Sequence, residues 1–354
     1  MKVVTWIWVV ICFVACSKGE EPKSESMPVS FYRAADMSFL PTIEKSGLPY
    51  KNNNKTEDPL ITLQKAGCNT IRLRLWHSPS GSGSGFEEVK AFAERIRKTG
   101  MKIWLSVHYS DTWADPGRQN KPEAWKNMDF SSLKSELKEY TDNIILGIKP
   151  DIIQIGNETN DGMLWPEGRL SQNEAQYVEL LHDVCETIRS RNSQTKIMLH
   201  YAGINGAQWY FSKVAGADFD YIGISYYPLW HGKNLDAFRT GLETLGQATQ
   251  KKIIIAETAY PFTLGWNDWT NNIVGLPEQL VPGFEATKEG QKNFLATIRN
   301  IIDESPHGKG FCYWGTEWVA FRGKESTNGS SWENQALWDF TNNALPALEA
   351  FKPN

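Results

Sequence analysis

The sequence predicts a single (β/α)₈ barrel. From residue 28 onward, strand-like and helix-like segments alternate without a linker or a low-complexity stretch. Eight segments have the length and the apolar, β-branched composition of buried strands: 29–34, 70–75, 102–107, 152–155, 196–199, 221–224, 252–256 and 310–313. Eight such units in one unbroken domain describe a barrel. A doubly wound sheet is the alternative, but no glycine-rich phosphate-binding fingerprint follows the first strand.

The segments between the strands have helical periodicity, most clearly at 86–98, 133–146, 174–191 and 288–303. Directly after the strands the residues are polar or aromatic, whereas the strand bodies are mostly apolar. In chain order these residues are Asp36 and Ser38, Arg74 and Trp76, His108, Tyr109 and Asp111, Asn157 and Glu158, His200, Ser225, Tyr226 and Tyr227, Glu257, and Trp314. Because the C-terminal strand ends of a barrel meet at one face, the pattern indicates a functional site there.

The composition narrows the class of function. With 354 residues, of which 41% are hydrophobic, the chain can bury one large core or two modest ones. A net charge of −4 gives no electrostatic reason to expect a nucleic-acid partner. The sequence also contains 15 Trp and 12 Tyr, and flat aromatic rings in loops suit the apolar faces of sugar rings.

The N-terminus resembles a bacterial lipoprotein signal. The apolar run 3–15 is too short to span a bilayer as a helix, and it ends in FVAC (13–16), which is similar to a lipobox. We therefore expect Cys16 to be acylated and the membrane to be reached only through this lipid anchor. The following KGEE (18–21) resembles signals for the outer cell surface, so the expected location is the outer membrane of the cell envelope. The expected parts are a signal peptide at 1–15, a flexible tether at 16–27 and the barrel domain at 28–354.

The other cysteines, Cys68, Cys185 and Cys312, are odd in number, unclustered and set mostly in apolar surroundings. This pattern predicts buried thiols rather than metal ligands or a disulfide framework.

Two glutamates occupy the same kind of position, just after an apolar strand. The strand 152–155 is followed by Asn157 and Glu158, and the strand 252–256 runs directly into Glu257. A single strand-end glutamate is typically only a solvated acid, but two of them suggest opposite walls of one aromatic-lined cleft. That arrangement suits glycoside hydrolysis, in which one acid protonates the leaving oxygen and the other attacks or activates water.

Other chemistries have weaker support. No Ser/His/Asp order favours acyl transfer, and the six histidines show no HExxH spacing for zinc. Metal ligation by His108 and His200 stays an alternative, but hydrogen bonding to substrate is favoured. We expect no cofactor.

Seven motifs make the sequence similar to glycoside hydrolase family 53, the endo-β-1,4-galactanases, from about residue 32 to 351. They are AADMS (34–38), AGCNTIRLRLW (66–76), HYSDTWADPGRQNKPEAW (108–125), IQIGNETNDGMLWPEG (153–168), IGISYYPLWHG (222–232), IAETAYP (255–261) and WENQALWDF (332–340). The resemblance implies a retaining (β/α)₈ hydrolase acting on β-1,4-galactan or arabinogalactan.

The resemblance also implies residue roles. Glu158 would be the acid/base and Glu257 the nucleophile, with Asn157 hydrogen-bonded to the sugar 2-hydroxyl. Arg74 and Tyr226 would hold the nucleophile in its charged form. The floor and surroundings of the −1 subsite would come from Trp314, His108, Asp36 and Trp113.

The sequence departs from the family at three places. Thr159 stands where Ile is usual, and Gly315 stands where the family commonly has Glu after the tryptophan of the eighth strand. Some bacterial members bind calcium in the last two loops, where residues 262–275 offer Asp268 among three asparagines. One acid among amides is a poor site for a hard cation, so we predict no calcium.

Two other readings remain open from sequence. One is another β-glycanase on the same scaffold, such as a mannanase or glucanase, which hydrolysis of a polysaccharide panel would identify. The other is a surface glycan-binding protein without catalysis, against which the presence of both Glu158 and Glu257 argues.

Overall fold

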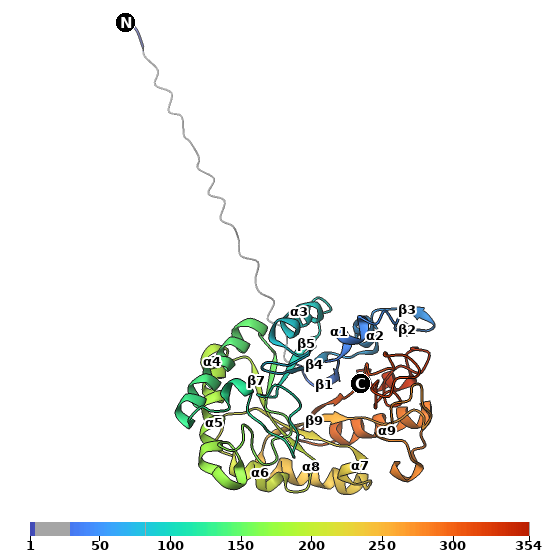
Figure 1. The fold of residues 1–354 in the computed structure, drawn as a ribbon. Helices are drawn as coiled ribbons and strands as arrows, with labels where there is room; N and C mark the ends of the chain where they lie inside the picture. Colours follow the sequence, from blue (N-terminus) through green and yellow to red (C-terminus); the bar gives the residue numbers. More distant parts are fainter. Residues whose placement is uncertain (4–28, 82, 354) are drawn as a thin grey trace. The chain divides into compact units, whose positions relative to one another are not determined.

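Eight parallel strands close into a barrel among the residues that the computed structural model describes, which are 1–3, 29–81 and 83–353 (Figure 1). They are β1 (Tyr32–Asp36), β4 (Thr70–Leu75), β5 (Lys102–Val107), β6 (Ile152–Ile155), β7 (Lys196–Ala202), β8 (Tyr221–Ser225), β9 (Lys252–Thr258) and β10 (Gly308–Tyr313). Their order around the barrel is β1-β10-β9-β8-β7-β6-β5-β4, and β4 pairs with β1 to close it. The predicted (β/α)₈ barrel is therefore confirmed.

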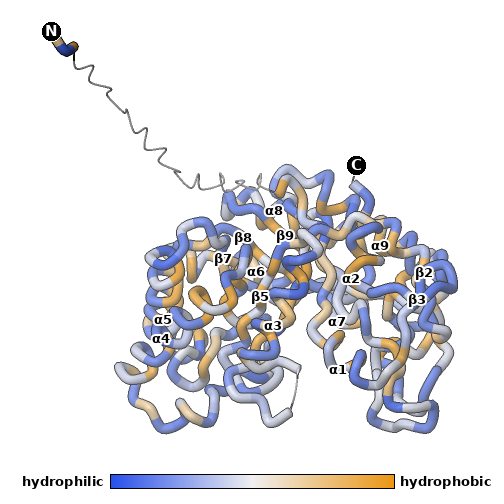
Figure 2. Tube along the Cα trace, turned by 90° about the horizontal axis from the view of Figure 1, so that it is seen from above, coloured by the Kyte–Doolittle hydropathy of each residue, from blue (hydrophilic) through white to orange (hydrophobic). Residues whose placement is uncertain are grey.

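Helices connect the strands and cover the barrel (Figure 1). They are α1 (Leu40–Glu44), α2 (Pro59–Ala66), α3 (Phe86–Arg97), α4 (Phe130–Ile148), α5 (Leu170–Arg191), α6 (Ala207–Lys213), α7 (Pro228–His231), α8 (Leu235–Thr249) and α9 (Lys288–Asp303). Three 3₁₀ helices add η1 (Glu123–Trp125), η2 (Pro277–Gln279) and η3 (Pro346–Phe351), and a small hairpin adds β2 (Lys51–Asn52) and β3 (Lys55–Thr56). Hydrophobic stretches follow the barrel strands, whereas the hairpin is hydrophilic (Figure 2).

The predicted strand positions agree closely with the observed ones. Three ranges, 70–75, 102–107 and 152–155, coincide with β4, β5 and β6. The first strand lies later than predicted, at Tyr32–Asp36, because its ladder to β10 begins at Tyr32 and Gly310. The prediction ended β9 at residue 256, but the strand continues to Thr258 and so contains Glu257.

Alternation of side chains along β4 divides apolar packing from the site. Ile71, Leu73 and Leu75 belong to the apolar core under the helices. The side chains between them, Arg72 and Arg74, turn to the opposite face and line a cavity at the barrel mouth, as the period of two along a strand requires. The barrel interior below the C-terminal strand ends is therefore polar.

Outside the site, the three cysteines of the barrel are buried free thiols, as predicted. In the part of the chain that the structure describes, no helix has the length and apolarity needed to cross a membrane. The predicted lipidation site Cys16 and the predicted tether lie outside the described residues.

Candidate active site

A cleft of about 550 Å³ opens at the C-terminal strand ends, a size typical of ligand sites. Most of the predicted site residues line it: Asp36, Arg74, His108, Trp113, Asn157, Glu158, Glu257 and Trp314. Tyr226 does not. The strand-end polar pattern thus located the site, although some of the roles assigned within it need correction.

Glu257 reaches the cleft through an irregularity in β9. Ile253 and Ile255 of this strand pack into the apolar core, so strict alternation would turn Glu257 toward the helices as well. The ladder to β8 shifts register here, since Ile224 pairs with Ile255 but Ser225 pairs with Glu257. A bulge re-aims the side chain that follows it, and here it brings the carboxylate to the mouth of the barrel.

Two groups hold the Glu257 carboxylate. Arg72 Nη2 lies 2.8 Å from Oε1, and the Tyr227 hydroxyl donates to Oε2 at 2.9 Å. Arg72 also binds Asp36 Oδ2 at 2.9 Å, and its side chain is almost fully buried. A buried guanidinium flanked by two carboxylates is fully paired, so it fixes the position and favours the charged form of Glu257.

The structure corrects the prediction that Arg74 and Tyr226 hold the nucleophile. The Arg74 guanidinium instead binds Ser84 Oγ and lies over the rings of Trp76 and Trp113, 4.4 and 4.1 Å from their centroids. The Tyr226 hydroxyl donates to the Gly232 carbonyl, and its ring stacks on Phe238.

The physical reason is strand parity. Tyr226 continues the outward-facing set of Ile222 and Ile224, whereas Tyr227 continues the inward-facing set that includes Ser225. The sequence therefore contained the signal that selects Tyr227. The sequence contained no signal that selects Arg72 over Arg74, because both side chains are on the inward face of the strand and differ only in how deep they lie in the barrel.

Glu158 is oriented by a chain of hydrogen bonds from neighbouring strands. The Glu158 backbone N–H donates to His200 Nδ1 at 3.2 Å, so the proton of this neutral imidazole is on Nε2. That nitrogen lies 2.9 Å from Ser225 Oγ, and the Ser225 hydroxyl donates to Glu158 Oε1 at 2.6 Å. His200 is fully buried and bonded to protein at both nitrogens, so the prediction that it binds substrate is wrong.

The two carboxyl groups differ in how their charge is compensated. Burial raises the pKa of Glu158 to about 8, and the negative charge of Glu257 adds to this effect. Burial also raises the pKa of Glu257, but Arg72 and the Tyr227 hydroxyl act against it. Of this coupled pair, Glu158 therefore keeps the proton at neutral pH and Glu257 carries the charge.

Asn157 has a fixed amide orientation. Its Oδ1 accepts from Arg72 Nη2 at 2.9 Å, and its Nδ2 donates to the Ala114 carbonyl at 2.9 Å. Gln154, one layer deeper, donates to the same Oδ1 at 3.1 Å. These bonds connect Asn157 to the guanidinium that holds Glu257, so the amide and the Glu257 carboxylate are positioned together.

His108 presents a neutral ring to the cleft. Burial, followed by the charges of Arg74 and Arg72, holds its pKa well below the usual value. Its Nδ1 accepts the Ala114 backbone N–H at 3.1 Å, which leaves the ring proton on Nε2. His108 is thus a neutral hydrogen-bond donor in the cleft.

Tryptophan rings form a continuous strip along the cleft. Trp314 lies in the middle, with its ring centroid 6.1 Å from that of Trp113 and 4.5 Å from that of Trp332. From Trp332 the strip continues to Trp230 at 6.4 Å, whereas Trp76, 5.4 Å from Trp113, does not line the cleft. Such a strip, longer than one sugar unit, suits a chain of pyranose rings.

The residues after the eighth strand that differ from the family pattern have structural consequences. Gly315 has a φ of +69°, a left-handed conformation in which a glutamate would be strained. Glu317, two residues later, is buried and accepts the Phe39 backbone N–H at 2.6 Å. Burial and the charge of Asp36 raise its pKa to about 8. It does not replace the missing acid in the cleft lining.

The prediction that no calcium binds was based on a single acid, Asp268, and the structure brings a second acid next to it. Glu333, from the loop after β10, is fully buried and accepts the backbone N–H groups of Asn267 and Asp268. Asp268 itself is buried and accepts the Thr270 N–H at 2.6 Å. The absence of calcium stays a prediction, but Asp268 is not the only acid between these loops.

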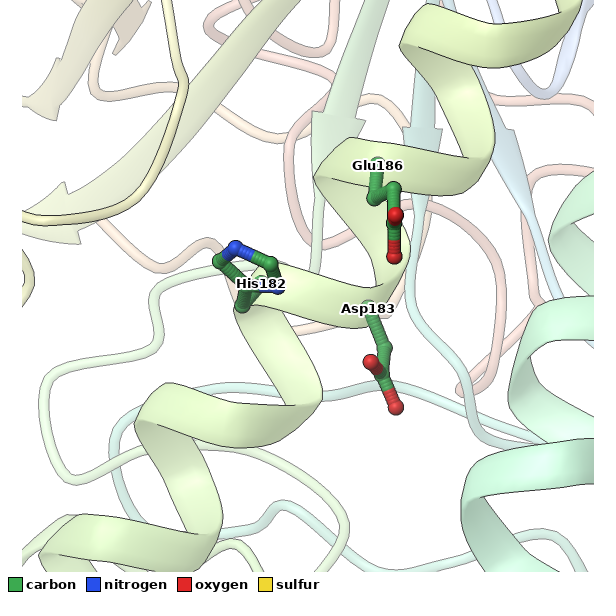
Figure 3. Close-up of side chains that lie close together, drawn as sticks. All are labelled: His182, Asp183 and Glu186. Atoms are coloured by element: carbon green, nitrogen blue, oxygen red, sulfur yellow. The ribbon is translucent and has the colours of Figure 1, made fainter.

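Within the described residues, three potential metal ligands also come together away from the cleft, on α5 (Figure 3). They are His182, Asp183 and Glu186. Asp183 already has Lys134 at 3.4 Å, and Glu186 has Lys138 at 4.0 Å. Lysines compensate both acids, so this group is a charged helix surface rather than a metal centre.

Comparison with known proteins agrees with the geometry. The family model for glycosyl hydrolase family 53 matches residues 32–351. An arabinogalactan endo-β-1,4-galactanase of Cellvibrio japonicus is 34% identical, with 91% of this chain and 90% of that protein aligned.

Two solved structures are also similar. The family 53 catalytic domain of Ignisphaera aggregans is 35% identical, with a TM-score of 0.86 and coverage of 93% of this chain and 97% of that one. A fungal β-1,4-galactanase is 30% identical, with a TM-score of 0.77 and coverage of 90% and 98%.

Proposed function

Because the chain belongs to glycosyl hydrolase family 53, we propose that it is an endo-β-1,4-galactanase that hydrolyses the galactan of pectic arabinogalactan with retention of configuration. The observation that carries the mechanism is the contrast between two carboxyl groups in one cleft. Glu257 is ion-paired with Arg72, whereas Glu158 is partly buried beside that negative charge and keeps its proton.

In the first step, a Glu257 oxygen attacks the anomeric carbon and forms a glycosyl ester. The bond to the leaving oxygen breaks, and Glu158 gives this oxygen its proton. Asn157, with its amide fixed by Arg72 and Ala114, is placed to bind the 2-hydroxyl, where a hydrogen bond strengthens as the ring becomes cation-like.

In the second step the same environment reverses the role of Glu158. Burial still raises the pKa of Glu158, but once Glu257 is esterified its negative charge no longer adds to that rise. The Glu158 carboxylate then accepts a proton from water, which attacks the anomeric carbon and releases Glu257. Two inversions give net retention.

Hydrolysis of a polysaccharide panel, followed by proton NMR of the first products, tests this function. We expect fastest cleavage of unbranched β-1,4-galactan, with the new reducing end released as the β anomer. Faster cleavage of mannan or glucan would identify a different substrate, and initial release of the α anomer would exclude the double displacement. Absence of any turnover would indicate a glycan-binding protein.

We further propose that the protein is a lipoprotein of the outer membrane, anchored through Cys16. The support is the sequence alone, in which an apolar run ends in a lipobox-like FVAC. In the producing cell, Cys16→Ser is expected to release the protein from membranes or to leave the precursor uncleaved. Normal cleavage with unchanged membrane association would contradict the anchor.

A further inference from the structure

Exposed large hydrophobic side chains gather on one loop segment beside the cleft. Among the described residues after Ser30 there are six such side chains, and three of them lie within residues 266–276. They are Trp266, Trp269 and Leu276, exposed by 52%, 60% and 52%. Single exposed apolar residues need no explanation, but two tryptophans three residues apart in one loop do.

This segment adjoins the wall of the cleft. The Trp269 N–H donates to the Ser326 carbonyl, and the Ile273 N–H donates to the Ser331 carbonyl, both at 3.0 Å. Ser331 lines the cleft, and Ile273 shares a small hollow with Trp230 and Trp332 of the tryptophan strip. The surface that carries the exposed tryptophans is therefore continuous with the rim of the cleft.

Hydrogen bonds to two buried acids hold the backbone between the two tryptophans in place. The buried Glu333 carboxylate accepts the N–H groups of Asn267 and Asp268 at 2.5 and 3.2 Å. The Asp268 carboxylate in turn accepts the Thr270 N–H at 2.6 Å. Because the loop is already ordered, a ligand that stacks on its rings does not have to order the backbone.

We propose that Trp266 and Trp269 form an accessory binding surface for the galactan chain outside the cleft, an inference that rests on the proposed function. The axial 4-oxygen of each galactose unit, which carries the linkage in the chain, leaves the opposite ring face lined by C–H groups, and this face suits stacking on an exposed indole. Galactan is uncharged, which agrees with a segment whose exposed side chains, Trp266, Trp269, Asn271 and Leu276, carry no charge. The surface retains long chains and does not take part in bond cleavage.

The test compares the double variant Trp266→Ala/Trp269→Ala with Trp209→Ala. Trp209 is equally exposed, at 52%, but lies on α6, and so it controls for the loss of any surface tryptophan. In affinity electrophoresis through gels containing long-chain galactan, the double variant is expected to bind about tenfold more weakly than wild type, and Trp209→Ala to bind normally. On galactotetraose, kcat/KM is expected to be unchanged in both.

Each other result overturns the inference. Unchanged retention by the polymer would show that the tryptophans do not bind galactan, as expected if the surface instead serves a protein partner. Equal loss in Trp209→Ala would make the effect nonspecific, and loss of activity on galactotetraose would assign the residues to the cleft. If wild type neither cleaves galactan nor is retained by it, the proposed function fails and this inference with it. If wild type cleaves galactan and the double variant is retained normally, the proposed function holds and only the inference fails.

Discussion

At the scale of single residues, the different environments of the two glutamates predict different defects. Glu158→Ala removes the proton donor, so galactan hydrolysis is expected to fall by about 10²–10⁴-fold. A dinitrophenyl β-galactoside, whose leaving group needs little protonation, is expected to lose much less. Azide added to this variant attacks the glycosyl ester on Glu257 and is expected to give the β-azide.

Glu257→Ala supplies the contrasting case. Without the nucleophile both substrates are expected to fail together, and azide in its place attacks the intact substrate to give the inverted α-azide. The configuration of the two azides, read by proton NMR, decides the assignment. If the products were exchanged between the two variants, the roles of Glu158 and Glu257 would be reversed.

Two adjacent tyrosines allow a matched test of what holds the nucleophile. Tyr227→Phe removes a hydrogen bond that stabilises the Glu257 carboxylate, so the pKa of Glu257 rises and the acidic limb of kcat/KM moves to higher pH. Bonds to charged groups are worth about 1.5–3 kcal/mol, which corresponds to a rate loss of roughly tenfold or more. Tyr226→Phe is expected to keep the wild-type pH profile and lose about 1 kcal/mol of stability. Equal pH profiles for the two variants would contradict the assignment.

The residues that sequence reasoning placed correctly follow strands and carry distinctive chemistry. Asn157, Glu158 and Glu257 were found because polar groups end apolar strands. Tyr227 was missed although strand alternation selects it. Arg72 and His200 lie deeper in the barrel, and their roles depend on distances across the barrel that no linear pattern contains.

At the scale of elements, burial of an apolar face decided what could be predicted. The strands β4, β5 and β6 and the helix α9 have the bounds that periodicity indicated, because each buries apolar side chains. The hairpin of β2 and β3 contains no fully buried residue and has no such signal. The bulge in β9 was also unpredictable, since it depends on pairing with β8.

The loop elements after β9 and β10 are joined by Glu333, and this junction predicts a pH-dependent stability. Burial, aided by the charge of Asp268, raises the pKa of Glu333 to about 7, whereas an unfolded glutamate titrates near about 4.3. The folded state thus binds the proton more tightly, and stability falls as pH rises between these two values.

Glu333→Gln tests this junction, because the amide oxygen still accepts the same N–H groups but cannot ionise. In EDTA, which removes any bound cation, the variant is expected to melt at least about 2 °C above wild type at pH 8 and to lose this advantage at pH 5. Glu325→Gln, an exposed acid of the same loop, is the control and is expected to change little. A variant less stable than wild type at pH 8 would contradict the raised pKa of Glu333.

At the scale of the whole molecule, barrel closure is what turns eight separate strand ends into one site. Glu158 follows β6 and Glu257 belongs to β9, and the sheet order places β7 and β8 between them. Ser225 of β8 and His200 of β7 bridge this gap by hydrogen bonds to Glu158. The two glutamates therefore act as a pair only in the closed barrel.

The arrangement of the cleft predicts that the enzyme cuts inside the polymer. The tryptophans that line the cleft extend from Trp314 toward Trp113 on one side and toward Trp332 and Trp230 on the other. We therefore expect sugar units to bind on both sides of the cleaved bond. The viscosity of a galactan solution is therefore expected to fall well before many reducing ends appear. Chromatography of the earliest products is expected to show a range of oligosaccharides.

The variant Trp230→Ala tests whether the end of the strip binds the polymer, independently of any general loss of activity. Trp230 is 56% exposed at the end of the strip, so its removal is expected to weaken binding of long galactan and leave the smallest cleavable oligosaccharides little affected. The measurement is KM as a function of chain length, with kcat as the control. If galactose alone were released from the first time point, or if KM rose equally for every chain length, one end of the cleft would be closed to the polymer and the enzyme would act from a chain end.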